Sequence, residues 1–141
     1  MNRATPQQQD FAARLIAFEV ARTRSADPQM SAAFAVPDKM RPHLTTLMGN
    51  GGHRALLMRA LALAGAEAPW LRDIQIAVDG TLERPDPAGG AVDPDDLIEG
   101  GVVLAGRLLG LLVAFIGERL TLQLVREIWP KLPAKDLKFK I

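Results

Sequence analysis

The sequence of 141 residues has no cysteine, no tyrosine and few aromatic residues of any kind. The absence of cysteine excludes disulfides, thiolate metal ligands and cysteine nucleophiles, and it fits a protein that folds in a reducing compartment. Because aromatic residues make up only 5% of the chain, it offers few flat side chains on which nucleic-acid bases or sugars stack. The missing residue types therefore narrow both the catalytic chemistry and the modes of nucleic-acid binding.

A strong charge of either sign is also missing, because 17 basic and 16 acidic residues leave a net charge of +1. The chain as a whole is therefore not drawn to nucleic acid or to an acidic membrane surface. The first seven residues, MNRATPQ, lack the apolar run of a secretory signal, so we expect a cytoplasmic protein. A hydrophobic content of 48% supplies the core of one domain of ordinary size, and we predict a single helical domain over residues 1–141.

Proline and glycine divide the first half of the sequence into helical stretches. Thr5 and Pro6 are a capping residue and a first-turn proline, which predict a helix to about Ser25. A second, shorter helix is expected from Pro28. Because proline removes a donor and clashes with the preceding turn, Pro37 and Pro42 are expected to interrupt it, with a further helix over residues 38–48.

A glycine-rich turn over residues 49–52 separates this stretch from the most regular amphipathic helix of the sequence. Apolar residues at helical spacing run from His53 to Ala64, and Pro69 ends the pattern. The alternation over residues 74–78 and the dipeptide Asp79-Gly80 then predict a small β-hairpin that returns over residues 81–83. Residues 84–93 are expected to form a surface loop.

The last third of the sequence predicts one long helix. Asp93-Pro94 is a strong helix start, and Pro130 gives the end, so we expect a helix from Pro94 to Trp129 that bends at Gly100-Gly101. A lysine-rich tail follows over residues 131–141. The fold class predicted from these elements is mainly α: a four- to five-helix, bundle-like domain with a long C-terminal helix and one small β-hairpin.

The long helix is apolar almost all round, which is typical of a helix buried in a protein core or in a membrane. Its charge-free run, Leu108–Gly117, is half of the roughly 20 residues that a membrane span needs. Arg107 would add a cost of about 3 kcal/mol in the bilayer, so we expect no membrane partner. Small residues at every third or fourth position favour close packing against another helix, in this domain or in a second copy. The predicted interface residues are Gly106, Arg107, Gly110, Ala114 and Gly117, with Phe139 in the tail as a docking residue.

The segment from Asn50 to Arg54 is the strongest candidate for a binding site. A glycine-rich turn that leads into a helix offers backbone N–H groups to an anion, and arginine adds positive charge. The predicted anion-binding residues are Asn50, Gly51, Gly52, His53 and Arg54. The same helix–turn–helix outline also allows nucleic-acid binding through Arg54 and Arg59, although a near-neutral chain lacks the basic stripe that is usual in such proteins.

Catalytic chemistry has little support in the sequence. No nucleophile, metal-protease, phosphate-loop or dinucleotide motif is present. The two histidines, His43 and His53, have no further ligand at a metal-site spacing, so we expect no metal, no cofactor and no enzyme. The function favoured by the sequence is a non-catalytic interaction, regulatory or adaptor module that self-associates or docks on a helical protein. The alternative is a nucleic-acid- or anion-binding regulator that uses the glycine-rich turn.

Overall fold

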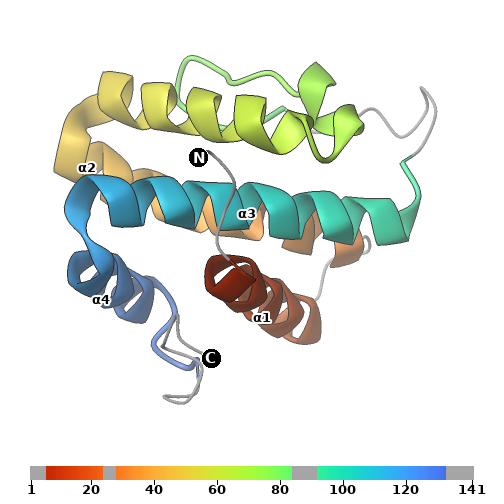
Figure 1. Ribbon diagram of the computed structural model, residues 1–141, viewed down its shortest axis with the longest axis horizontal. Helices are drawn as coiled ribbons and strands as arrows, with labels where there is room; N and C mark the ends of the chain where they lie inside the picture. The colour runs from red at the N-terminus through yellow and green to blue at the C-terminus, as the bar shows by residue number, and fades with distance from the viewer. Residues whose placement is uncertain (1–5, 24–27, 84–91, 133–141) are drawn as a thin grey trace.

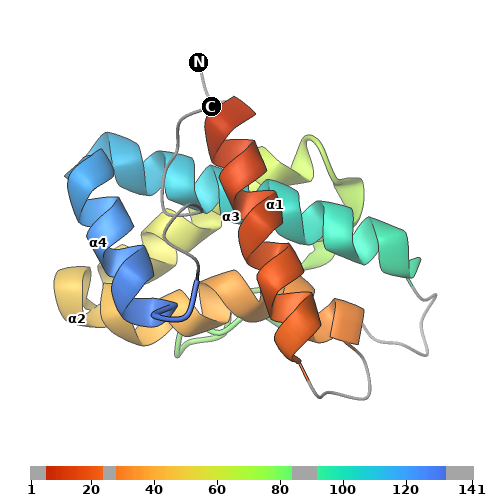
Figure 2. The ribbon, with the colours of Figure 1, turned by 90° about the horizontal axis from the view of Figure 1, so that it is seen from below.

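In the described residues four α-helices pack together, which confirms the mainly α prediction (Figure 1). The structure is a computed structural model, and it describes residues 6–23, 28–83 and 92–132. Helix α3 runs through the middle, with α2 along it and α1 across it (Figure 2). The elements in chain order are α1 (Pro6–Arg22), α2 (Pro28–Gly65), the 3₁₀ helix η1 (Pro69–Asp73), α3 (Pro94–Ile116) and α4 (Glu118–Ile128).

Helix α2 continues through Pro37 and Pro42, so the predicted division into two short helices is wrong. Proline has no N–H to give to the carbonyl four residues before it. For Pro37 that carbonyl belongs to Ala33, which lies against Gly101 of α3: a Cβ placed on Gly101 would be 2.9 Å from the Ala33 oxygen. Both Pro37 and Ala33 are buried. Packing against α3 therefore stabilises a helix that the local sequence disfavours.

The predicted turn over residues 49–52 is in fact a joint of one residue. Gly49 has φ 78° and ψ 164°, whereas Asn50 and the residues after it are already helical. A positive φ is strained for residues with a side chain but is readily adopted by glycine. The joint divides α2 into two straight halves, which lie on different sides of α3 (Figure 1).

The predicted β-hairpin has no strands in the described residues. A single isolated bridge joins Ile76 to Leu82, and the N–H of Gly80 donates to Ala77 to close the turn. Two short strands alone are marginal in water, and no third strand lies beside this pair in the part of the chain that the structure describes. The segment is held instead by packing, because Leu82 is buried and Ile76 packs against the core.

The predicted long C-terminal helix is two helices. Its start is confirmed, because the side chain of Asp93 accepts a hydrogen bond from the Asp95 N–H at 2.9 Å. Gly100 and Gly101 lie inside an unbroken α3, and the break comes at Gly117, with φ 91°. The chain therefore turns between α3 and α4 through one residue.

Glu19 of α1 connects this helix to Trp129, which follows α4, and to Lys39 of α2. Its carboxylate accepts a hydrogen bond from Trp129 Nε1 at 2.7 Å and pairs with Lys39 Nζ at 2.6 Å. Glu19 and Trp129 are both buried, at 7% and 2% exposure. A carboxylate out of water is costly unless it is paired and hydrogen-bonded, and these two partners satisfy it. The cluster thereby fixes the end of α4 relative to α1 and α2.

Candidate functional site

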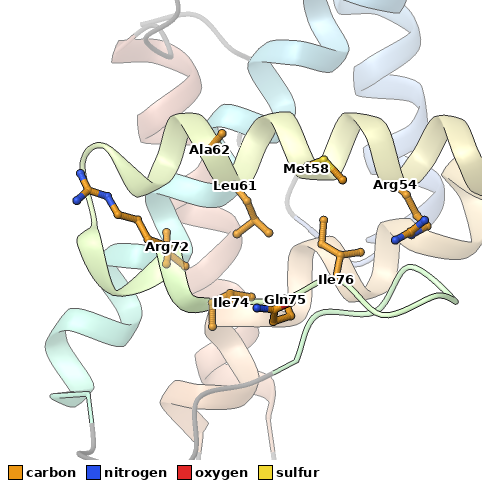
Figure 3. Close-up of a pocket in the computed structure, with 9 residues that line it drawn as sticks. Arg54, Met58, Leu61, Ala62, Arg72, Ile74, Gln75 and Ile76 are labelled. Carbon is orange, nitrogen blue, oxygen red and sulfur yellow. The ribbon is translucent and has the colours of Figure 1, made fainter.

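The predicted anion-binding residues do not converge on one point. Asn50 and Gly51 are exposed, and the amide of Asn50 donates to the carbonyl of Val78 at 3.2 Å. His53, by contrast, is buried at 1% exposure, and Arg54 turns toward a separate cleft (Figure 3). Asn50, His53 and Arg54 lie within about one turn of a helix, where successive side chains point in directions about 100° apart. The side chain of Asn50 is therefore bound to the neighbouring turn, the ring of His53 is buried, and the guanidinium of Arg54 lies in the cleft.

His53 is held inside the fold with both ring nitrogens lacking a hydrogen-bond partner among the described residues. Gly80 lies directly against the ring, since a Cβ there would be 2.8 Å from His53 Nδ1. Burial lowers the pKa of His53 below its ordinary value of 6.5, and the charge of Arg41 lowers it further. The ring is therefore neutral at neutral pH. It is suited to packing, and a buried neutral imidazole does not attract an anion.

Arg107, a predicted interface residue, is paired within its own chain. Its Nη2 and Nε lie 2.6 and 2.9 Å from Glu67 Oε2, and the Arg107 side chain is only 6% exposed. The prediction that Arg107 belongs to an interface with another chain stays a prediction, and in the described structure the partner of Arg107 is an acid of its own chain. Arg107 connects α3 to the turn that follows α2, which is a contact within the chain.

The rest of the predicted glycine stripe is covered at one end and open at the other. Gly106 is buried, and Gly110 is packed by α1, because a Cβ there would lie 2.9 Å from Gln8 Oε1. Ala114 and Gly117 are exposed. At the covered end, close packing within the chain explains why Gly106 and Gly110 are small. Only the open end, where α3 meets α4, remains available to a second molecule.

An apolar groove between α2 and α4 lies next to this open end, and the sequence did not predict it. Two adjoining hollows, of about 500 and 190 Å³, share Leu47, Leu124 and Glu127. Leu47 and Leu120 are 56% and 52% exposed, which is high for leucine. The sequence carried one signal for it: in segment 118–128 the apolar side chains occupy more of the helix surface than one buried face needs. Treating residues 94–129 as one helix obscured that signal.

Helix α3 meets the length and hydropathy expected of a membrane span, and 61% of the apolar window is buried inside the fold. Among the described residues, no group of three or more histidine or acidic side chains could hold a metal ion. Phe139, the predicted docking residue of the tail, lies outside the described residues, as do positions 84–91 of the predicted loop. The predictions for Phe139 and for the loop therefore stay predictions.

Comparison with known proteins adds no family to this geometry. No protein-family model matches the chain, and neither the curated proteins nor the solved structures give a match. Function is therefore inferred from the groove, the cleft and the side chains that form them.

Proposed function

We propose that this protein is a non-catalytic interaction module that self-associates through the groove between α2 and α4. The observation that carries the proposal is the exposure of Leu47 and Leu120 on the two sides of one apolar hollow. Isolated exposed leucines are common, but adjoining ones around a hollow mark surfaces that bind other proteins. Ile116 and Leu124, both partly buried, extend the same apolar lining.

The charges of α4 favour a second copy of this chain as the partner. Arg119 and Glu127 are both exposed and lie eight residues apart, about 12 Å along the helix. Two α4 helices packed antiparallel about a twofold axis would place Arg119 of each copy beside Glu127 of the other. Such an interface is self-complementary, because one surface serves both partners. The four charged residues of α4 are two acids and two bases, so the helices do not repel each other overall.

Sedimentation velocity over a range of protein concentrations tests the proposal. The wild-type chain should form dimers, and Leu120→Glu should weaken dimerisation at least tenfold, since a carboxylate would be buried in an apolar contact. Val78→Glu is the matched control, because Val78 is 83% exposed and does not line the groove. Far-UV circular dichroism checks that both variants fold. A wild-type chain that is monomeric at every concentration overturns the proposal.

A charge swap separates twofold pairing from unspecific association. Arg119→Glu should weaken the dimer by placing like charges together, and Glu127→Arg should do the same. The double variant should recover the wild-type dimer. If the two single variants are harmless, or the double variant is worse than either, the antiparallel arrangement is wrong.

A second candidate function is the binding of an anion or nucleic acid at residues 50–54. The observation in its favour is that Arg54 has no hydrogen bond or ion pair within the described part of the chain. Fluorescence anisotropy with labelled mixed-sequence DNA at low salt tests it, since phosphate contacts are strongest there. Loss of binding in the Arg54→Gln, Arg59→Gln variant would support it, and undetectable wild-type affinity would exclude it.

A further inference from the structure

A second hollow lies away from the α2–α4 groove, between the second half of α2 and the segment that follows η1 (Figure 3). Its volume is about 470 Å³, within the range of roughly 300–1,000 Å³ that is usual for small-molecule sites. The cleft is lined by Arg54, Met58, Leu61, Ala62, Leu71, Arg72, Ile74, Gln75 and Ile76.

Six of the nine residues that line the cleft are apolar, and the other three are polar or charged. Met58 is 56% exposed on the α2 side, and Ile74 and Ile76 face it from the opposite segment (Figure 3). Leu61 and Leu71 are buried beneath them. Methionine is flexible and polarisable, so it adapts to an aliphatic ligand. Among the described residues that line the cleft none is aromatic, so a ligand that binds by ring stacking is not favoured.

The positively charged side chain of Arg54 lies at one end of the cleft. Arg54 reaches down from α2 toward Ile76, and its Nε is buried without a hydrogen-bond partner in residues 6–23, 28–83 or 92–132. Arg72, at the other end, points away from the cleft and donates its Nε to the Gly65 carbonyl at 3.0 Å. A guanidinium stays protonated in proteins and pairs well with carboxylates. The cleft therefore combines an apolar channel with one unpaired positive charge.

We propose that this cleft binds a small aliphatic carboxylate, with the carboxylate on Arg54 and the hydrocarbon chain between Met58 and Ile76. From Arg54 to Ala62 the helix rises about 12 Å, which suits a chain of the length of octanoate or decanoate. Gln75, also in the lining, supplies an amide for a further hydrogen bond. This proposal stands independently of self-association, because the cleft and the α2–α4 groove share no lining residue.

Isothermal titration calorimetry with sodium octanoate and sodium decanoate on the full chain tests the site. Arg54→Gln should weaken binding at least about tenfold, the effect of losing one charge-assisted hydrogen bond in a partly buried place. Arg59→Gln is the matched control: it removes the same charge from an exposed position on the same helix, outside the cleft. Octanol, the neutral analogue, should also bind at least about tenfold more weakly than octanoate.

Three results would overturn the assignment. One is the absence of octanoate and decanoate binding at millimolar ligand. Another is an equal loss in Arg54→Gln and Arg59→Gln, which would show general attraction to a basic surface. The third is equal affinity for octanol and octanoate, which would leave no role for the carboxylate. The Leu120→Glu variant should bind octanoate like the wild type, so failure of self-association and failure of this site can be told apart.

Discussion

Gly101 offers the sharpest test of how α3 sits in the fold. A Cβ at this position would lie 2.7 Å from the Ala33 Cα and 2.9 Å from the Ala33 oxygen, both backbone atoms of α2. Backbone atoms in a packed helix cannot rotate aside, so Gly101→Ala must push the two helices apart. Such overpacking costs about 1–3 kcal/mol, and the better helix propensity of alanine offsets about 1 kcal/mol of it. We expect a net loss of up to about 2 kcal/mol and a fall in Tm of up to roughly 6 °C.

Gly51→Ala is the matched control for this substitution. Gly51 is also helical, and a Cβ there would meet nothing within 4 Å. The two variants change the unfolded chain in the same way, so the difference between them isolates packing. Urea unfolding followed by far-UV circular dichroism should show Gly51→Ala at or above wild-type stability, by up to about 1 kcal/mol. The reasoning is refuted if Gly101→Ala proves as stable as Gly51→Ala.

Three further outcomes follow from the described contacts. The free energy of unfolding should fall as pH drops below 6.5. Burial, and then the charge of Arg41, lower the pKa of His53 in the folded state, so the unfolded chain takes up the proton first. In urea midpoints measured between pH 7.5 and 5, His53→Leu should flatten this dependence. Arg107→Met should lower the free energy of unfolding by about 3 kcal/mol in chemical denaturation, because it leaves the carboxylate of Glu67 unpaired. Adding Glu67→Gln should recover part of that loss. If Arg107→Met is as stable as the wild type, the pair is dispensable. Gly49→Ala should cost about 1–3 kcal/mol in thermal unfolding, because φ 78° with ψ 164° lies in a region that is essentially restricted to glycine. An unchanged Tm would mean that the joint relaxes without strain.

The sequence predicted those parts of the fold that depend on local chemistry. The cap at Asp93 and the amphipathic helix after His53 are settled by neighbouring residues, and both are confirmed. Pro37 misled the prediction because the loss of its hydrogen bond is outweighed by tertiary packing, which local propensity does not contain. Gly110 and Gly117 look alike in sequence, yet only Gly117 has a positive φ. Which glycine bends a chain depends on contacts with distant helices.

The candidate sites were less predictable for a related reason. Anion binding by residues 50–54 stays a prediction, because the burial of His53 and the direction of Arg54 depend on the segment that packs beside α2. The α2–α4 groove exists only because the chain turns at Gly117, so a prediction of one long helix could not contain it. The cleft likewise needs residues 71–76 to lie along α2, which no pattern in either segment indicates.

The bond between Trp129 and Glu19 joins residues 110 positions apart. On a ribosome adding about 5–20 residues per second, α1 is therefore made on the order of 10 s before the indole that completes its buried carboxylate. Until then, among the described residues, the carboxylate of Glu19 has only the side chain of Lys39 as a partner, so this buried charge is incompletely compensated. The closing of the whole domain is thus coupled to the emergence of its last helix, so a chain truncated before Trp129 should remain sensitive to proteases however much of its core it contains.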